Sequence, residues 1–391
     1  MKNKVCLIGA GMTKFGVRDA TYRELIAEAG KACFDSLKGA IKPKDVDGFI
    51  LASVLPERNV FQSHVASLAE ETLGIRPTSL STRVEHMCAS GNVAIRLAYA
   101  SIVSGLAKTV MVVGVEKLNT PVISETFGNM GAGLDREFES SIGLTAPPVF
   151  AITAQAHMNK YGTTEEQLAA VSVKNRLHAS KNQNAHFRKP TTIEDALNGR
   201  IISSPLRLFD CSPITDGAAA VILTSDERAR DLVSKPVYLA GSGQVVNNFT
   251  VSNSYEDLAS WPALKLATQN AYQSAGITAS DVDLAEIHDC FSVAELMVYE
   301  EMGFCEKGEG GSFVSSGRAT YGGDVVVNPR GGLIGCGHPL GATGVAQACE
   351  IFWQLRGEAG DRQVNGAKIG LTHNNSGPGE HVVNIFSSEV L

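Results

Sequence analysis

Two short segments of this sequence carry side chains that could act together as a nucleophile and a base. Cys88 opens the segment Cys88-Ala89-Ser90-Gly91, whose small residues would let the backbone come close to a ligand. His338 lies in the glycine-rich run from Gly337 to Gly344, where a histidine is poorly suited to core packing. A thiol becomes an effective nucleophile when a nearby imidazole takes its proton. The pair therefore predicts covalent catalysis, against the alternatives of a buried structural cysteine and a loop histidine that bonds only to backbone.

Two further segments place polar or reactive residues at strand ends. His288-Asp289-Cys290-Phe291 follows the strand-like run Leu284–Ile287, and His373-Asn374-Asn375-Ser376-Gly377 is expected to end the last-but-one strand. We expect all four segments to converge on one site, with His288 and Cys290 beside Cys88 and His338. Cys336-x-His338 and His86-x-Cys88 could suggest zinc, but neither has the spacing of a metal knuckle. We predict no metal.

The elements around Cys88 are expected to tune its thiol. A predicted helix begins at Cys88, with an apolar face formed by Val93, Ala94, Leu97, Ala98 and Ile102. The unpaired N–H groups at a helix start carry partial positive charge, which favours a thiolate. We therefore expect the pKa of Cys88 to be lowered.

An internal repeat indicates how these elements are arranged. Three segments of the first half recur in the same order in the second half. The pairs are Val5–Gly11 with Val237–Gly243, Asp45–Leu51 with Asp281–Ile287, and the helix after Cys88 with the helix after Gly337. The repeat predicts two similar α/β halves stacked about a pseudo-twofold axis, with the Cys88 loop facing the His338 loop.

The first half is longer than the second, which indicates an insertion. The surplus falls in a stretch with glycine-rich and polar segments around a predicted helix near Ala151–Tyr161. We predict that residues 1–117 and 205–235 form the N-terminal half, residues 118–204 an inserted loop domain, and residues 236–391 the C-terminal half.

Bulk composition fits this picture and disfavours several classes of protein. The 391 residues are 44% hydrophobic and 19% charged, with a net charge of −7 and 39 glycines, which suits a packed α/β enzyme. No Lys/Arg block marks a nucleic-acid or membrane surface, and apolar runs such as Val110–Val115 are far short of the ~20 residues that cross a bilayer. The eight single cysteines, the lack of a signal peptide and the absence of a C-terminal Ser-Lys-Leu predict a cytoplasmic protein.

With these motifs in view, the sequence resembles the thiolase superfamily over essentially its whole length. The run Gly337–Gly344 matches the family's Gly-His-Pro-x-Gly-Ala-[Ser/Thr]-Gly signature, Cys88–Gly91 matches the nucleophile loop, and Asp210–Ala220 matches a third stretch. His288–Phe291 replaces the usual Asn-Glu-Ala-Phe, and His373–Gly377 lacks the usual cysteine. Both departures are similar to the sterol-carrier-protein-2 type and its bacterial and archaeal relatives.

The resemblance implies a thiolase-like fold with two βαβαβαββ halves and a defined chemistry. Cys88 would attack the ketone of a 3-oxoacyl-CoA while His338 takes its proton, leaving an acyl group on Cys88. Backbone N–H groups, His338 and a water held by His288 would stabilise the oxyanions. Cys290 would protonate the departing enolate, because the C-terminal loop has no cysteine. The Asp210–Ala220 segment is interpreted as structural.

The same resemblance implies partners. CoA would be a co-substrate, with no permanently bound cofactor, and a homodimer is expected. A small zinc-ribbon and OB-fold protein of the DUF35 type is a further expected partner. The alternatives are another condensing enzyme of the superfamily, such as a ketosynthase or a hydroxymethylglutaryl-CoA synthase, and a non-catalytic acyl-CoA-binding scaffold. The acyl pocket is expected to be lined by the insertion, including Thr126–Pro148, but the sequence does not define the acyl chain.

Overall fold

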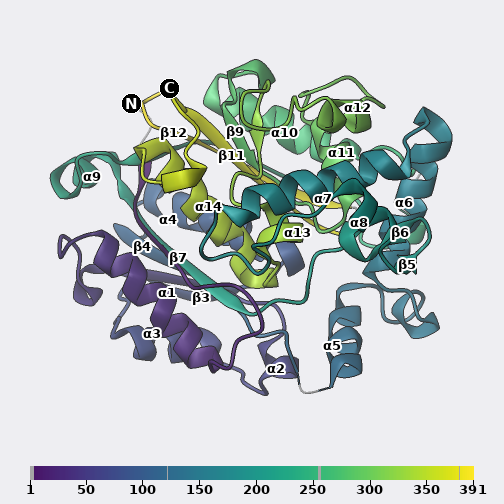
Figure 1. The fold of residues 1–391 in the computed structure, drawn as a ribbon. Coiled ribbons are helices and arrows are strands. Elements are labelled where there is room, and N and C mark those ends of the chain that lie inside the picture. Colours follow the sequence, from purple (N-terminus) through teal and green to yellow (C-terminus); the bar gives the residue numbers. More distant parts are fainter. Residues whose placement is uncertain (1–3, 121, 254–256, 378) are drawn as a thin grey trace.

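The computed structural model describes residues 4–120, 122–253, 257–377 and 379–391 as two α/β halves of the same topology (Figure 1). In the first half the repeated elements are β1 (Val5–Met12), α1 (Tyr22–Ser36), β2 (Gly48–Ala52), α3 (Val65–Leu73), β3 (Leu80–Val84), α4 (Ser90–Val103), β4 (Thr109–Glu116) and β7 (Gly217–Ser225). In the second half they are β8 (Val237–Val246), α10 (Pro262–Ala275), β9 (Leu284–Glu286), α11 (Ser292–Glu301), β10 (Val326–Val327), α14 (Leu340–Arg356), β11 (Ile369–Ser376) and β12 (Glu380–Ser387).

The strand order confirms the repeat. The ten strands run β3-β2-β4-β7-β1 and then β8-β12-β11-β9-β10, so the second half mirrors the first. In each half, counted from the outer edge of the sheet, the first three strands pair in parallel, and the fourth strand pairs antiparallel with both the third and the fifth. The halves meet where β1 pairs with β8 at Cys6 with Tyr238 and Leu7 with Val237.

The side chains of each strand alternate between two apolar layers, because successive strand residues point to opposite faces. Ile50 and Leu284 belong to a central core around α4 and α14, whereas Phe49 packs toward α1 and α3. On the other side, Ala285 packs toward α10 and α11. Helix α14 contacts strands of both halves. The two central helices therefore lie between the two halves and bring their N-terminal ends together.

Two glycines allow that close approach. A Cβ atom on Gly344 would lie 2.4 Å from the backbone nitrogen of Asn92, and one on Gly91 would lie 2.7 Å from the backbone nitrogen of Val345. Any side chain at either position would push α4 and α14 apart. The glycines of the two sequence motifs therefore hold the Cys88 and His338 segments next to each other.

The connection from β4 to β7 contains most of the remaining structure. Its elements are α5 (Ile123–Met130), α6 (Ala146–Tyr161), α7 (Glu165–Ser180), α8 (Ile193–Leu197) and the hairpin β5 (Ile201–Ser203) with β6 (Leu206–Arg207). The helix expected near Ala151–Tyr161 is α6. Helices α6 and α7 pack on the second half, where His157 Nε2 lies 3.0 Å from Glu300 and Lys174 Nζ lies 2.8 Å from Glu295 (Figure 1). The limits 118 and 204 for a separate loop domain stay a prediction.

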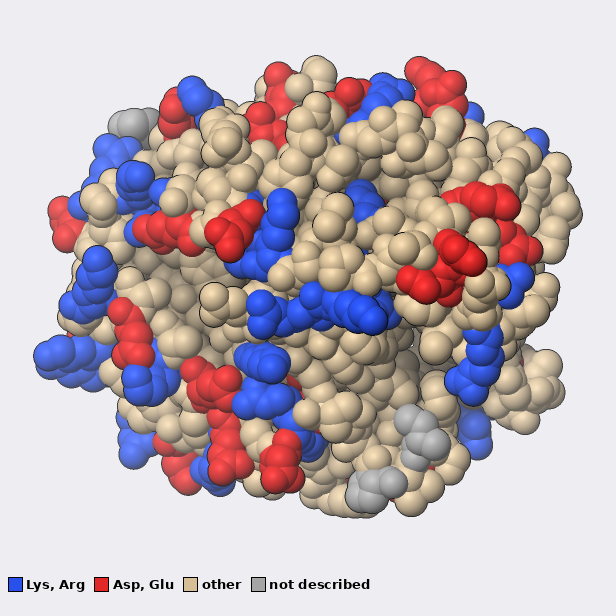
Figure 2. All heavy atoms as spheres, in the orientation of Figure 1, with Lys and Arg blue, Asp and Glu red and all other residues tan. Residues whose placement is uncertain are grey.

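Four short helices complete the described chain. They are α2 (Pro56–Asn59), α9 (Asp226–Leu232), α12 (Gly310–Ser315) and α13 (Gly332–Cys336). Within the described ranges, none of the helices combines the length and the apolar character needed to cross a membrane. On the face shown in Figure 2, basic and acidic side chains are interspersed, with a short row of basic ones across the middle.

Candidate active site

Cys88 lies in a strained turn that presents its thiol to a cavity. A single 3₁₀ turn, Met87–Ala89, precedes α4, which begins at Ser90 rather than at Cys88. Met87 has φ +43°, a left-handed conformation that costs a non-glycine residue about 1–3 kcal/mol. The Ser90 hydroxyl accepts a hydrogen bond from His86 N at 2.8 Å and donates one to Met87 O at 2.6 Å. These bonds hold the turn in its strained shape.

The C-terminal half holds the same turn from the other side. Ser376 Oγ, on β11, donates to His86 O and accepts from Ala89 N at 3.3 Å. His86 Nδ1 lies 2.9 Å from a carboxylate oxygen of Glu380, on β12. The Cys88 turn of one half is therefore positioned by strands of the other.

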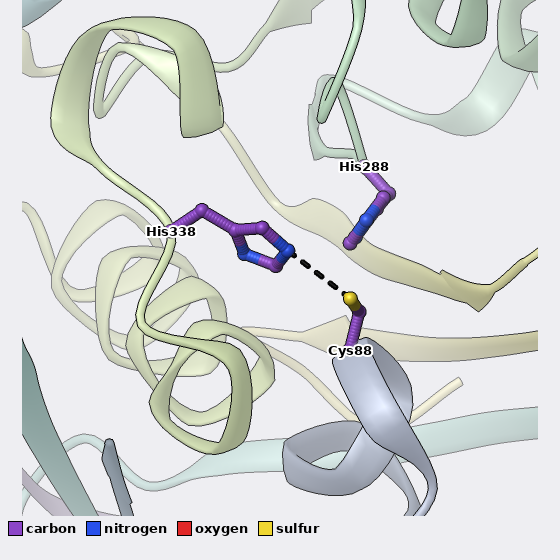
Figure 3. Close-up of side chains that lie close together, drawn as sticks. All are labelled: Cys88, His288 and His338. Carbon is purple, nitrogen blue, oxygen red and sulfur yellow. Dashed lines mark hydrogen bonds between the residues drawn. The ribbon is translucent and has the colours of Figure 1, made fainter. Parts of the chain in front are cut away.

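His338 faces Cys88 as the repeat predicted (Figure 3). Its Nε2 lies 3.2 Å from Cys88 Sγ, and its Nδ1 lies 2.8 Å from Thr343 Oγ1. The Thr343 hydroxyl donates to Pro339 O at 3.0 Å, so its oxygen is left to accept from His338 Nδ1–H. The lone pair of His338 is then on Nε2, directed at the thiol, which is the arrangement a general base requires.

His288 lies next to both Cys88 and His338, and its ring is 5.0 Å from that of His338 and nearly perpendicular to it (Figure 3). Its tautomer is the opposite one. Asn374 Nδ2 donates to His288 Nδ1 at 3.2 Å, and its orientation is fixed by Gln347 Oε1 at 2.9 Å. Because His288 Nδ1 accepts a hydrogen bond, its proton is on Nε2. The Cys88 sulfur and one ring nitrogen each of His288 and His338 all lie within 4.8 Å of one another. His288 can therefore donate to an oxygen or a water at the site where Cys88 would attack.

Burial keeps Cys88 and His338 uncharged in the resting protein. Burial, with the nearby Glu116 carboxylate, raises the pKa of Cys88 to about 12. Burial, with the positive charge of Arg330, lowers the pKa of His338 to about 3. The expectation of a lowered thiol pKa from the helix start is therefore wrong, because desolvation outweighs the helix terminus. At neutral pH the thiol therefore stays protonated unless a neighbouring base such as His338 takes its proton.

Cys290 lines the cavity next to His288. The strand before it, β9, ends at Glu286, one residue earlier than expected. Asp289 accepts hydrogen bonds from Leu333 N at 2.7 Å and Ile334 N at 3.1 Å, which fixes the segment against α13. Burial raises the pKa of the Cys290 thiol well above its usual value, with Cys88 and Asp289 adding to the effect. A neutral thiol here can donate a proton; its role as acid and base stays a prediction.

Three other residues of interest in the sequence are His373, Cys336 and Cys211. His373 lies in the last four residues of β11, at the strand end where it was expected, and its Nε2 lies 3.1 Å from His381 Nδ1. Cys336 is buried and lies 3.1 Å from the guanidinium of Arg330. Cys211 lines the active-site cavity together with the residues up to Ile214, so the purely structural interpretation of Asp210–Ala220 is wrong in part.

Glu116 is a neighbour of the site that the sequence did not reveal. Its buried carboxylate accepts backbone hydrogen bonds from Val54 at 2.9 Å, Leu55 at 3.2 Å and Gly341 at 3.0 Å. Burial raises its pKa to about 7. Since Gly341 begins the turn of α14, Glu116 ties the His338 segment to the first half. Its only sequence signal is an acidic residue at the end of an apolar strand.

The reactive residues open into one large cavity. Its volume is about 360 Å³, and it is lined by Cys88, His288, Cys290 and His338 and by many apolar side chains. Residues of the insertion, from Phe127 to Phe150, form one wall, as expected. The sulfur and two imidazoles could also bind a soft metal ion in principle. The absence of a metal stays a prediction.

Comparison with known proteins identifies the family. Residues 5–227 match the thiolase N-terminal domain, and residues 243–388 match a domain described as thiolase C-terminal domain-like. The acetyl-CoA acetyltransferase of Methanothermobacter thermautotrophicus is 43% identical over 98% of this chain and 99% of its own length. Sterol carrier protein 2 of Bos taurus is 36% identical over 99% of this chain and 72% of its own length.

A solved structure gives the same result. The Ltp2-ChsH2(DUF35) aldolase is 25% identical, with a TM-score of 0.84 over 100% of this chain and 99% of that chain. Two matching domains, full-length relatives and a facing cysteine and histidine all agree with the resemblance found in the sequence. The chain belongs to the thiolase family.

Proposed function

We propose that this protein is a CoA-dependent acyltransferase that cleaves a 3-oxoacyl-CoA by thiolysis, or runs the reverse Claisen condensation, through an acyl group on Cys88. The observation that carries the proposal is the 3.2 Å contact between Cys88 Sγ and the unprotonated Nε2 of His338. Homology to acetyl-CoA acetyltransferases supports it. Intact motifs and a hollow site favour an enzyme over the scaffold alternative, and the Gly337–Gly344 run favours a thiolase over other condensing enzymes.

The first half-reaction follows from the two tautomers. Cys88 Sγ attacks the 3-keto carbon while His338 Nε2 takes the thiol proton. His288 Nε2–H, directly or through a water, stabilises the resulting oxyanion. When the Cα–Cβ bond breaks, the acyl group remains on Cys88 as a thioester and the electron pair leaves on the CoA enolate. Cys290 Sγ–H protonates the enolate carbon, which releases acetyl-CoA or its homologue.

The second half-reaction transfers the acyl group to CoA. The Cys290 thiolate formed in the first half-reaction takes the proton of the incoming CoA thiol, which attacks the thioester. The tetrahedral intermediate collapses, and His338 returns its proton to Cys88. Both groups regain their starting states, so the cycle needs no metal or redox cofactor.

The cellular location and the protein partners belong to the same proposal. We assign the protein to the cytoplasm, where its eight free cysteines stay reduced. We expect a homodimer, and a DUF35-type partner is suggested by the complex named for the structural relative.

The proposal is tested by trapping the intermediate. Incubation with a 3-oxoacyl-CoA in the absence of free CoA should add one acyl group per chain, found by peptide mass spectrometry on Cys88. Cys88→Ser should show no adduct, because a serine hydroxyl is far harder to ionise. Cys305→Ser, which alters a half-buried cysteine outside the cavity lining, is the matched control and should acylate normally. An unacylated wild-type protein, or an adduct on another residue, would contradict the proposal.

A further inference from the structure

Outside the cavity lining, the carboxylate of Glu295, on α11, is buried and contacts four side chains that donate to it. Lys174 Nζ lies 2.8 Å from Oε1, and the Tyr299 hydroxyl donates to the same oxygen. The amides of Asn175 and Asn328 donate to Oε2 at 2.7 and 2.8 Å. A buried carboxylate with this many donors is held in one position. Glu295 is therefore a rigid point to which neighbouring segments are attached.

Asn328 attaches the end of the strand before His288 to this point. Its Oδ1 accepts a hydrogen bond from Ile287 N at 2.8 Å, while its Nδ2 donates to Glu295. Asn328 has φ +55°, a left-handed conformation that asparagine adopts more readily than most residues. Because Ile287 directly precedes His288, one side of this histidine is held through Asn328.

Asn175 attaches the residue on the other side of His288. Its Nδ2 donates to Asp289 Oδ2 and to Glu295 Oε2, both at 2.7 Å. The reversed amide would direct its oxygen at two carboxylates, so the contacts decide which atom is the nitrogen. Among the described residues, no donor bonds to Asn175 Oδ1, so the amide contributes only its two N–H groups. His288 thus lies between two anchored residues, and Cys290 follows the second of them.

Asn175 belongs to the connection between β4 and β7. It is a buried residue of α7, which packs on α11 and α13 (Figure 1). The Asp289 carboxylate that it contacts also accepts hydrogen bonds from Leu333 N and Ile334 N on α13. Helix α13 ends two residues before His338. The connection therefore contacts the segments that carry the reactive residues, in addition to forming a wall of the cavity.

Stability alone does not explain this cluster. It buries the carboxylates of Asp289 and Glu295 near each other, with the single cation of Lys174 beside them. Burial, with the charge of Glu295, raises the pKa of Asp289. A buried set of charges is often no more stable than apolar side chains of the same volume. A role in fixing the geometry of the attached segment accounts for the cluster better.

We infer that Asn175 is a positioning residue: by joining Asp289 to Glu295, its amide holds His288 and Cys290 at the cavity in the orientation that the reaction requires. Asn175 is outside the cavity lining and acts only through these residues. The inference rests on the proposed function, in which His288 stabilises the oxyanion and Cys290 transfers the proton of the enolate carbon.

Asn175→Leu tests the inference in the whole enzyme. Leucine keeps the approximate volume and removes both N–H groups, so that Asp289 and Glu295 lose their bridge. A misplacement of about 1 Å costs a reacting group about a hundredfold in rate, so kcat should fall by about that factor while KM changes less than about twofold. The exchange of acetyl-CoA α-protons with deuterated water should fall by a similar factor. Wild-type values of kcat and exchange in the folded variant, checked by circular dichroism, would overturn the inference.

Asn175→Asp keeps the shape of the side chain and makes the loss depend on pH. The ionised new carboxyl repels Asp289 and Glu295, whereas the protonated one donates an O–H to one of them. The ratio of variant to wild-type kcat should therefore rise about tenfold from pH 9 to pH 6, and the same ratio for Asn175→Leu should stay flat. Taking the ratio removes the titration of groups that both proteins share. On the elements packed around Asn175 these include Lys174 and His178 on α7, Glu295 and Tyr299 on α11, Cys336 on α13, and His288, Asp289 and Cys290.

The matched control is Asn159→Asp, the same substitution at an exposed position of α6. Its oxygen keeps the hydrogen bond from Gln155 Nε2, and its kcat should equal the wild-type value at both pH values. An equal, pH-independent loss in both Asn175 variants would show that the side chain only fills space and would overturn the inference. If Asn175→Leu does not fold, the ratio for Asn175→Asp decides alone, and a flat ratio overturns the inference. A wild-type enzyme that neither cleaves 3-oxoacyl-CoA nor exchanges α-protons would instead remove the proposed function.

Discussion

The two histidines beside Cys88 are in different tautomers, because different side chains contact their Nδ1 atoms. Thr343 offers an oxygen to His338, so the proton stays on Nδ1; Asn374 offers an N–H to His288, so the proton stays on Nε2. One imidazole is therefore set up to accept a proton and the other to donate a hydrogen bond. The four sequence motifs predicted which residues gather, but not the tautomers, because Asn374 and His288 are 86 positions apart.

Asn374→Asp should reverse the His288 tautomer. A carboxylate at this position accepts a hydrogen bond from Nδ1–H, so the ring proton moves to Nδ1 and Nε2 is left with a lone pair facing the developing oxyanion. We expect kcat to fall by about 10²–10³ while KM changes little, as for a lost oxyanion-hole donor. Asn198→Asp, an exposed asparagine at the end of α8, is the control in the same steady-state assay. An unchanged kcat for Asn374→Asp would contradict the assignment of His288.

Cys290→Ala separates the two proton transfers of the cycle. The exchange of α-protons of acetyl-CoA with deuterated water should slow by about 10²–10⁴, the size typical of a lost acid or base. Acylation of Cys88 should persist, because it needs only Cys88 and His338. NMR of the exchange and intact mass of the protein measure the two effects. Cys211→Ala tests the other lining thiol, and if it alone slows the exchange, the assignment to Cys290 fails.

At the scale of elements, the site depends on how closely α4 and α14 approach. Gly344→Ala would place a methyl group 2.4 Å from Asn92 N and 2.5 Å from Asn374 Oδ1. We expect a loss of about 1–3 kcal/mol in unfolding free energy, as for an overpacked core, and a larger drop in activity because Cys88 moves away from His338. Denaturant titration and kcat measure both. Gly128→Ala, where a Cβ meets nothing within 4 Å, should not show the stability loss.

The contact between the Cys88 turn and β12 gives a second element-scale prediction, for pH. The hydrogen bond to Glu380 raises the pKa of His86, with Glu85 adding to the effect and partial burial opposing it. Its folded pKa is thus above the unfolded value of about 6.5. The added stability is complete below the unfolded pKa and is lost as pH rises through the folded pKa.

His86→Gln should therefore lower the thermal midpoint more at pH 6 than at pH 9. The effect should be small, because His86 is half-exposed and the pair is screened by solvent. Differential scanning calorimetry at the two pH values measures it, with His64→Gln as the control histidine outside the contact. Equal shifts at both pH values would show that the charged pair does not stabilise the turn. His86 and Glu380 are 294 positions apart, so no local sequence pattern could predict this contact.

At the scale of the molecule, the repeat determined what the sequence could predict. The order of strands, the stacking of halves and the meeting of Cys88 with His338 follow from three matched segments. The raised pKa of Cys88 and the cavity lining from Cys211 to Ile214 could not be predicted from the repeat. Both depend on how deeply the inserted connection covers the site. Burial is a property of the assembled chain, and desolvation reverses what a helix start alone would favour.

The two edges of the ten-stranded sheet are unequal. At one end β10 has two residues, whereas at the other β3 has five and is partly exposed. Val84 O accepts a hydrogen bond from Ser53 N, so the backbone groups of Val84 and of alternate residues face β2. The N–H groups of Ser81 and Arg83 then face outward. Such an unpaired row is a ready template for another strand.

We expect two copies of the chain to pair through β3, which would give the homodimer. Ser81→Pro removes one outward N–H without removing a bond to β2, and should convert the dimer to a monomer at micromolar concentration. Ser81→Ala is the matched control: it removes only the hydroxyl bond to Glu70 and should stay dimeric. Light scattering coupled to gel filtration measures both. A wild-type monomer would contradict the dimer, and a dimeric Ser81→Pro would show that the copies meet on another surface.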